Sequence, residues 1–217
     1  MFKYLRGENE MYNNYFQDKF KKNCNGCGIC ALKCPVNAIK MVEDAEGFFY
    51  PQIDKSKCIN CKMCERICSN NPVENKYETS IYIAKNKNEI QRMQSTSGGM
   101  FKVIAQEILD NNGIVFGVML DENMQIVHDF ASDIEECKKF SGSKYVRSNL
   151  NDSYIRVENF LKDGKKVLFT GTPCQCYALK KYLNKEYKTL LTCEIICHSN
   201  PSPKIFNMFI RNLEKDN

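Results

Sequence analysis

The stretch Cys24-x2-Cys27-x2-Cys30-x3-Cys34 and its repeat Cys58-x2-Cys61-x2-Cys64-x3-Cys68 decide how the first part of this 217-residue chain folds. Together the two runs use eight of its 13 cysteines. Three cysteines separated by two residues each lie on one tight loop, so their thiolates can cover one face of a compact metal centre. The fourth cysteine of each run cannot reach that same centre. The repeat therefore predicts two centres.

The spacing of both runs is the ligand pattern of a ferredoxin-type domain that holds two 4Fe-4S clusters. In the known two-cluster geometry, the last cysteine of each run binds the cluster of the other run. The first cluster is therefore assigned Cys24, Cys27, Cys30 and Cys68. The second cluster is assigned Cys58, Cys61, Cys64 and Cys34.

Disulfides and zinc are the competing interpretations of these cysteines. Disulfides need an oxidising compartment, but residues 1–20 carry charges throughout and contain no apolar run of signal-peptide length, which predicts a cytoplasmic protein. Zinc is usually held by two separated pairs of ligands, whereas each run here places four sulfurs within eleven residues. Iron-sulfur clusters are favoured. A zinc-stapled interaction module is the alternative that iron and sulfide analysis would test.

Small residues around the runs fit the same domain. Gly26 and Gly28 lie inside the first loop, where the backbone must bend tightly and turn its amide groups toward the cluster sulfurs. Pro35 follows the first run, as in bacterial ferredoxins. Ser69 stands where the second run would have its proline, which weakens the match slightly without removing a ligand.

The length leaves room for a ferredoxin-type domain of about 70 residues and one further domain. The expected organisation is an N-terminal leader at 1–22, the two-cluster domain at 23–70, a polar linker at 71–78 and a second domain at 79–217. No stretch approaches the length of a membrane span. The formal net charge of +5 falls to about +1 when two oxidised clusters are counted with two negative charges each. The lysines form no long basic run, so no nucleic-acid partner is predicted.

Hydrophobic periodicity predicts the elements of both domains. Between the cysteine runs, strands are expected at 38–42 and 47–51 around an acidic turn. In the second domain, strands are expected at 81–84, 114–120, 125–130, 166–170 and 190–196, and helices at 98–110, 152–161, 173–183 and 203–213. The predicted fold class is an α+β ferredoxin-like two-cluster domain followed by an α/β layered domain.

Four short segments carry a more specific signal: S-T-S-G-G-M-F at 95–101, G-S-K-Y-V at 142–146, F-T-G-T-P-C-Q at 169–175 and C-H-S-N-P-S-P at 197–203. In this order, behind a two-cluster domain, they resemble the family of coenzyme F420 hydrogenase/dehydrogenase beta subunits. The resemblance runs from about Asn23 onward. It implies an iron-sulfur flavoprotein of anaerobic metabolism that passes electrons between clusters, FAD and a two-electron partner such as coenzyme F420.

The resemblance also implies a flavin site. A hydroxyl- and glycine-rich loop before a helix can hold a phosphate or the polar edge of a flavin, although serine and threonine there also serve as ordinary helix N-caps. A lysine and a tyrosine nearby would supply a cation and a stacking ring, but alone they are an ordinary loop pair. The expected cofactor residues are Ser95, Thr96, Ser97, Gly98, Gly99, Lys144, Tyr145, Thr170, Gly171, Thr172, Pro173 and Gln175.

Thr172 and Pro173 predict the start of a helix, as N-cap and first helical residue. Cys174 then lies in the first turn, where the helix dipole favours a thiolate, although a buried structural cysteine is the competing interpretation. Cys176 lies roughly 200° around the same helix and is expected to point away. Cys197 is expected at the end of the strand 190–196, at the rim where open α/β sheets bind ligands.

In the resembling family, the cysteines that match Cys174 and Cys197 are ligands of an additional cluster, completed by a Cys-x2-Cys pair farther downstream. This sequence reaches Asn217 before any such pair, and Cys137 is expected in a surface helix. Glycine would also be expected where Ser199 stands. The resemblance therefore implies an incomplete third ligand set and an α/β domain truncated at its C-terminus.

The resulting functional prediction is an iron-sulfur protein that passes electrons between two 4Fe-4S clusters and FAD. It would be an oxidoreductase subunit linked to coenzyme F420 or ferredoxin if its flavin site is intact. The expected partner is a redox protein or subunit such as a ferredoxin, a hydrogenase or a dehydrogenase. The alternative is a stand-alone two-cluster ferredoxin with a truncated, non-catalytic docking domain. A flavin absorption band would separate the two.

Overall fold

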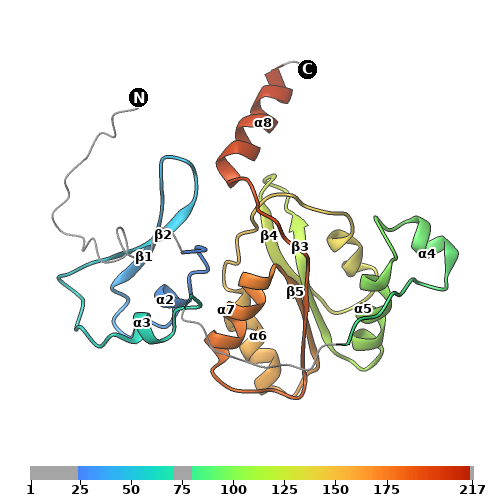
Figure 1. The fold of residues 1–217 in the computed structure, drawn as a ribbon, viewed down its shortest axis with the longest axis horizontal. Coiled ribbons are helices and arrows are strands. Elements are labelled where there is room, and N and C mark those ends of the chain that lie inside the picture. Colours follow the sequence, from blue (N-terminus) through green and yellow to red (C-terminus); the bar gives the residue numbers. More distant parts are fainter. Residues whose placement is uncertain (1–23, 71–79, 216–217) are drawn as a thin grey trace. The chain divides into compact units, whose positions relative to one another are not determined.

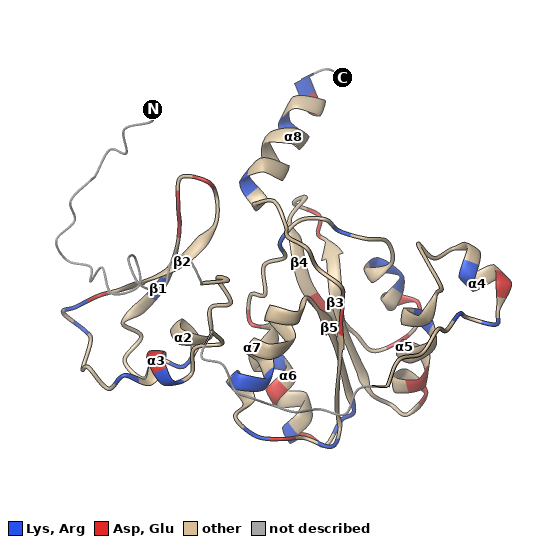
Figure 2. Ribbon diagram, viewed as in Figure 1, with Lys and Arg blue, Asp and Glu red and all other residues tan. Residues whose placement is uncertain are grey.

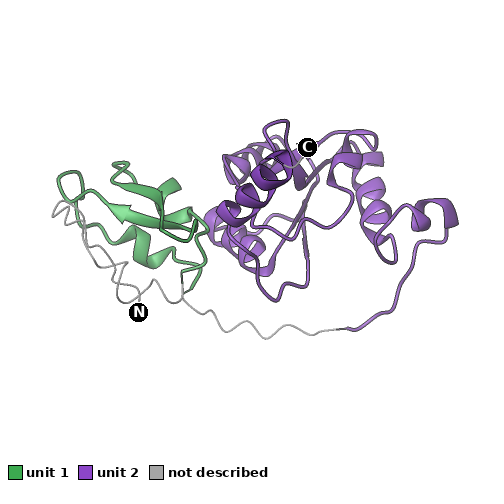
Figure 3. Ribbon diagram, turned by 90° about the horizontal axis from the view of Figure 1, so that it is seen from above, with its two compact units in different colours: residues 1–71 green, residues 72–217 purple. Residues whose placement is uncertain are grey.

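The computed structural model describes residues 24–70 and 80–215 of the chain. It divides into two compact units, Met1–Asn71 and Pro72–Asn217, which Figure 3 shows in green and purple. The expected leader at 1–22 and the expected linker at 71–78 lie outside the described residues.

The first unit is a two-stranded antiparallel sheet beside two short helices (Figure 1). Its elements are α2 (Ile29–Leu32), β1 (Ile39–Glu43), β2 (Phe49–Ile53) and α3 (Met63–Arg66). The register places Ile39 opposite Ile53, and both side chains are buried against the cysteine-bearing loops. The strand pair expected between the two runs is confirmed, displaced by one or two residues. This strand pair supplies the small apolar core against which both cysteine runs pack.

The second unit is built on a mixed four-stranded sheet of order β4-β3-β5-β6. The strands are β3 (Ile114–Leu120), β4 (Ile126–Ala131), β5 (Val167–Gly171) and β6 (Leu190–Glu194). β3 pairs antiparallel with β4 and parallel with β5, and β5 pairs parallel with β6. The α/β layered domain expected from the sequence is therefore present, with one hairpin at the edge of an otherwise parallel sheet.

Helices pack on both faces of this sheet (Figure 1). One face is covered by α5 (Met100–Asp110) and the short 3-10 helix η1 (Glu136–Phe140), which bury Ala105, Ile108 and Phe140 against β3 and β5. The other face is covered by α6 (Ser153–Lys162) and α7 (Pro173–Leu183). Because successive residues of β5 alternate between the faces, Leu168 packs on the α5 side while Phe169 packs on the side of α6.

Aromatic rings fill the core beneath α6 and α7. Phe116, fully buried on β3, lies 5.9 to 6.2 Å from the rings of Phe130, Phe160 and Phe169. These centroid distances are in the range of favourable aromatic pairs. The cluster holds the carboxyl end of β5 against both helices, and that end is where the sequence places several candidate site residues.

Four sequence-based expectations for this unit need correction. Residues 81–84 form no strand: Ile81, Tyr82 and Ile83 are 84 to 104% exposed, and no strand of the described residues pairs with them. The pattern is β-prone, but a strand requires a partner edge. The short helix α4 (Glu89–Met93) was not predicted; the side chain of Asn88 caps it by accepting a hydrogen bond from the N–H of Gln91.

The third correction concerns Cys137, which lies in η1 and is 3% exposed instead of sitting on a surface helix. It packs into the core cluster that η1 shares with α5 and the sheet. The fourth concerns β6, which ends at Glu194, two residues earlier than expected. The remaining expected helices are confirmed within two residues, including α8 (Pro203–Lys215), in which no residue is buried.

Candidate functional site

The two cysteine runs adopt the same backbone at equivalent positions. Gly26 and Gly28 have φ angles of +61° and +77°, and their counterparts Asn60 and Lys62 have +53° and +57°. A left-handed residue directly precedes α2 in the first run and α3 in the second. Glycine adopts this conformation without strain, and asparagine tolerates it, whereas lysine does not favour it. The repeated spacing in the sequence is therefore a repeated loop in the structure.

Cysteine sulfurs in these loops receive hydrogen bonds. The N–H of Gly26 donates to Cys24 Sγ at 3.4 Å, and the N–H of Ala38 donates to Cys34 Sγ at 3.2 Å. Amide donors aimed at thiolate sulfur are one of the means by which a protein sets the potential of an iron-sulfur cluster. The loops thus present sulfur with donors already in place.

The structure brings the last cysteine of each run toward the other run. A small pocket is lined by Cys34 of the first run together with Cys58, Cys61 and Cys64 of the second. At the end of the second run, the hydroxyl of Ser69, which directly follows Cys68, lies 3.4 Å from Cys27 Sγ of the first run. Both observations are compatible with the crossed ligand assignment, which stays a prediction.

The donor chemistry of these sulfurs suits a strongly cationic centre. Burial and the neighbouring Cys27 and Cys24 thiols raise the pKa of Cys30 well above its usual range, and burial likewise raises the pKa of Cys64. Clustered thiols of this kind lose their protons when iron supplies the compensating charge. Among the described residues, no disulfide joins any two of the thirteen cysteines, and no three potential ligands enclose a single metal ion. A cube of four irons spaces its ligands more widely than one ion does.

In the second unit, the predicted start of α7 is confirmed. Thr172 is the N-cap residue and Pro173 the first helical residue. The side-chain oxygen Oε1 of Gln175 accepts from both the N–H and the hydroxyl of Thr172, each at 3.0 Å. These groups stabilise the turn between β5 and α7, so the local structural role of the segment is established by its own contacts.

A buried chain of hydrogen bonds connects this turn to β4. Gln175 Nε2 donates to the hydroxyl of Ser148, which donates to His128 Nδ1, both at 2.9 Å. His128 Nε2 then donates to the carbonyl of Thr170 at 3.1 Å. Burial, opposed by this last bond and assisted by the charge of Arg147, lowers the pKa of His128 to about 4. The imidazole is therefore neutral near pH 7, with Nε2 protonated.

The two cysteines of α7 lie in different environments, as expected. Cys174 is partly exposed, with its Sγ 3.2 Å from the hydroxyl of Thr172. Cys176 is fully buried, and burial raises its pKa to about 12. Cys197 lies beyond the end of β6 instead of ending that strand, and its exposed Sγ accepts a 3.6 Å hydrogen bond from Asn200. Of these three, Cys174 and Cys197 have sulfurs accessible to a ligand.

The Ser95 to Gly99 loop does not form the side-chain N-cap that is one interpretation of its sequence. Gly99, with φ +72°, is the N-cap residue of α5, and no side chain caps that helix. Ser95 instead donates its hydroxyl to the carbonyl of Gln91 at 2.8 Å, closing the end of α4. Thr96 and Ser97 are exposed. The serine and threonine side chains thus leave the first amides of α5 available, while Gly98 packs close to the backbone of Ala84.

Lys144 and Tyr145 lie in different environments. Lys144 Nζ donates to the carbonyls of Ser141 at 2.7 Å and Lys139 at 3.1 Å, and burial lowers its pKa. It is therefore already engaged in holding its own loop. The ring of Tyr145 is 77% exposed and accessible for stacking.

Arg147, two residues farther along, was not singled out in the sequence. Its Nη2 atom is buried and has no hydrogen-bond partner among the described residues. An orphaned, buried guanidinium nitrogen is costly unless an anion or another acceptor meets it. The only signal in the sequence that could have indicated Arg147 is that it follows Lys144 and Tyr145 in the 142–147 loop, as a third basic or aromatic residue. The charge of Arg147 also lowers the pKa of His128, so the two side chains lie near each other. The unpaired donor makes the 142–147 loop suitable for binding an anionic group such as a pyrophosphate.

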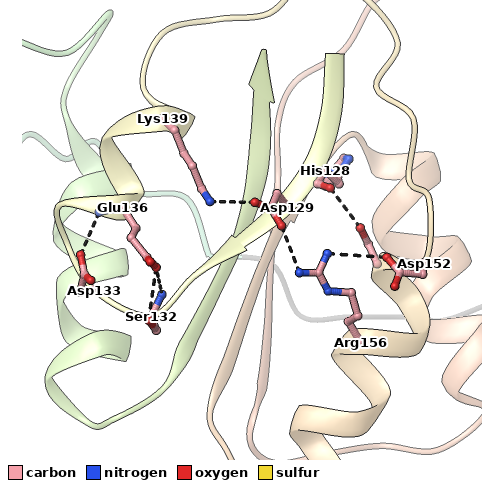
Figure 4. A network of polar contacts seen from close by, with 9 residues as sticks. His128, Asp129, Ser132, Asp133, Glu136, Lys139, Asp152 and Arg156 are labelled. Atoms are coloured by element: carbon pink, nitrogen blue, oxygen red, sulfur yellow. Dashed lines mark hydrogen bonds and ion pairs between the residues drawn. The ribbon is translucent and has the colours of Figure 1, made fainter. Parts of the chain in front are cut away.

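An ion-pair network fixes both ends of this loop (Figure 4). Asp129 on β4 accepts from Lys139 of η1 at 2.7 Å and from Arg156 of α6 at 3.2 Å. Arg156 also lies 3.6 Å from Asp152. Although burial acts to raise the pKa of Asp129, the Lys139 bond and the two cations hold it below its usual range. These ion pairs anchor η1, before the 142–147 loop, and α6, after it, to β4.

Charges elsewhere are mixed in sign. Figure 2 shows lysines and arginines interspersed with aspartates and glutamates over both units, with an acidic tip on the β1–β2 turn. In the part of the chain that is described, no helix is long and apolar enough to cross a membrane.

Comparison with known proteins covers both units. The family model of the 4Fe-4S dicluster domain matches residues 23–71. The model of the C terminus of the coenzyme F420 hydrogenase/dehydrogenase beta subunit matches residues 164–217. The chain is also similar to the F subunit of the F420H2 dehydrogenase of Methanosarcina mazei, with 22% identity over 80% of this chain and 53% of the relative.

The predicted resemblance to the family of coenzyme F420 hydrogenase/dehydrogenase beta subunits is therefore confirmed by matches in both units. An uncharacterized protein of Methanocaldococcus jannaschii is 24% identical over 81% of the chain and 57% of the relative. An uncharacterized ferredoxin from the same organism is 34% identical over 24% of the chain and 68% of the relative. The chain thus spans about half the length of the two relatives that it matches in both units. The match at residues 23–71 supports the 4Fe-4S dicluster domain that the cysteine spacing predicts.

Proposed function

We propose that this protein passes electrons between two 4Fe-4S clusters in its first unit and FAD in its second, as an oxidoreductase subunit of the cytoplasm. When bound, the clusters supply one-electron transfer, and the flavin exchanges one-electron for two-electron chemistry. The observation that carries the proposal is the placing of Cys34 with Cys58, Cys61 and Cys64 around one pocket. The partners we propose are a hydrogenase, dehydrogenase or ferredoxin, with coenzyme F420 as the two-electron acceptor or donor.

In the first unit, the chain would act by holding and shielding the clusters. Cys24, Cys27, Cys30 and Cys68 would hold the first, and Cys58, Cys61, Cys64 and Cys34 the second. The amides of Gly26 and Ala38 donate to sulfur, and the buried Ile39 and Ile53 exclude water from one side. Cys61 and its neighbours are exposed, so the second cluster would be the one nearer to solvent.

In the second unit, the observation that supports a flavin is the unmet donor of Arg147, whose charge acts on His128; the ring of His128 in turn bonds Thr170 in β5. Its guanidinium would bind the pyrophosphate of FAD, since arginine pairs with phosphate through charge-assisted hydrogen bonds. The exposed ring of Tyr145 would stack on an aromatic part of the cofactor, and the uncapped amides of α5 would add donors. Thr170, Gly171, Thr172, Pro173 and Gln175 would shape the site through their turn.

A flavin-less docking domain is the second candidate function, and one set of contacts favours it. The side chains of Thr170, Thr172 and Gln175, and the ammonium of Lys144, are all hydrogen bonded within the chain. A domain that has satisfied these groups internally needs no cofactor to do so. The two candidates predict the same clusters and differ in flavin content.

The proposal is tested by anaerobic purification or reconstitution with iron and sulfide. The expected content is about eight iron and eight sulfide per chain, with one FAD per chain. About twelve iron would indicate a third cluster at Cys174 and Cys197. Eight iron without flavin absorption would favour the docking-domain function, and zinc in place of iron would refute both.

Arg147 offers a separate test of the flavin site. In Arg147→Ala, the affinity for FAD should fall at least tenfold, because a charge-assisted hydrogen bond contributes about 1.5–3 kcal/mol. Affinity for riboflavin, which has no phosphate, should stay unchanged. Fluorescence titration measures both, and Arg211→Ala on the exposed α8 is the matched control. Equal losses for the two flavins would show that Arg147 supports the fold and does not contact the pyrophosphate.

A further inference from the structure

Ser69 occupies the position at which bacterial two-cluster runs carry proline, and the structure gives it a specific contact. Its side chain is buried, with 8% of the residue exposed. Its hydroxyl lies 3.4 Å from the Sγ of Cys27, which is 42 residues earlier in the sequence. Sulfur accepts hydrogen bonds at longer distances than oxygen does, so this is a contact of hydrogen-bond length.

The direction of this hydrogen bond follows from the chemistry of a cluster ligand. Between a free thiol and a hydroxyl, either group can donate. A cysteine that binds iron does so as a thiolate and has no proton to donate. Once Cys27 is a ligand, the hydroxyl of Ser69 must be the donor. Proline at this position has neither a hydroxyl nor an N–H and could not replace it.

We propose that Ser69 is a positioning residue that raises the reduction potential of the first cluster by donating a hydrogen bond to Cys27 Sγ. The inference rests on the proposed function, because it requires Cys27 to be a cluster ligand. One-electron reduction adds negative charge to the iron-sulfur centre and its thiolates. A donor at sulfur stabilises the more negative state more strongly, and burial increases the effect by lowering the local dielectric.

Among the described residues, the second ligand set has no equivalent contact. Within residues 24–70, no serine or threonine hydroxyl donates to Cys34, Cys58, Cys61 or Cys64. Cys61, the counterpart of Cys27 in the repeat, is exposed. A change at Ser69 should therefore move one potential and leave the other in place, which is a pattern that a general loss of packing would not produce.

The test is a redox titration of the full chain, anaerobic and cluster-loaded, followed by electron paramagnetic resonance and visible absorption. In Ser69→Ala, the equilibrium constant for reducing one of the two clusters should fall between about threefold and tenfold, where tenfold corresponds to 59 mV for one electron. Ser69→Pro should give the same shift. Ser69→Thr, which keeps the hydroxyl, should restore the original potential.

Ser56→Ala is the matched control. Its hydroxyl donates to Asp54 Oδ1 at 2.6 Å in the same unit and not to a cysteine sulfur, so neither potential should move. Unchanged potentials in Ser69→Ala with about eight iron retained would overturn the inference about Ser69 and leave the proposed function intact. A parent protein without iron would instead refute the proposed function. Equal shifts of both clusters, or no rescue by threonine, would also overturn the inference.

Discussion

Replacing Cys34 by alanine is expected to remove the second cluster and lower the iron content from about eight to about four per chain. Cys34 belongs to the first run, but it lines the pocket of Cys58, Cys61 and Cys64. Without it, that set has three thiolates for a cluster that needs four. Iron and sulfide analysis, with electron paramagnetic resonance of the reduced protein, would measure the loss.

The reciprocal change distinguishes crossed from local ligation. Cys68→Ala should damage the first cluster, because the contact between Ser69 and Cys27 places the end of the second run beside the first loop. Cys193→Ala, which removes a cysteine of β6, should leave both clusters intact and is the control. The crossed assignment would be wrong if each variant lost the cluster nearest to it in sequence.

The largest stability effect in the second unit is expected at Phe169. Its ring is fully buried, stacked on His128 at 5.2 Å and close to Tyr154 at 6.0 Å. Phe169→Ala should lower the free energy of opening by about 3–5 kcal/mol, the usual cost of deleting a buried aromatic ring. It should also loosen the buried chain from Gln175 to Thr170, because His128 loses the surface against which it packs.

Native-state hydrogen exchange of β3 and β5, measured anaerobically by mass spectrometry, would detect this effect. Exchange of the slowest amides should become at least about a hundredfold faster, as a loss of 3 kcal/mol implies. Phe209→Ala on α8 is the control, since its side chain is 57% exposed and its removal should cost less than about 0.5 kcal/mol. Similar acceleration in both variants would contradict this account of the core.

The resemblance to the family and the iron-sulfur ligand pattern could be recognised from the sequence for a physical reason. Ligand spacing is a local property: three cysteines separated by two residues form the same loop wherever they occur, and the loop recurs here with left-handed residues at equivalent positions. The helix start at Thr172 and Pro173 is equally local, because capping depends on neighbouring residues. The buried strands were predictable because continuous apolar runs need to be covered on both faces.

Features that depend on distant partners were decided only by the tertiary structure. Residues 81–84 have a strand-like sequence but no neighbouring edge among the described residues, and Cys137 is buried because η1 packs against β3 and β4. Lys144 and Gln175 carry groups suited to a cofactor, yet the fold uses those groups in its own hydrogen bonds. Conversely, nothing local distinguished Arg147, whose buried and unmatched nitrogen arises from the way its loop is held beside β4.

Ser69 shows the division between local and tertiary information most clearly. In the sequence it is a departure from the expected proline, and the spacing of the cysteines predicts no role for it. Its hydroxyl reaches Cys27 only because the two runs fold back on each other across 42 residues. The local spacing of the cysteines thus predicts which sulfur atoms would bind iron. The environment of each sulfur depends on packing between distant segments, and that was decided by the tertiary structure alone.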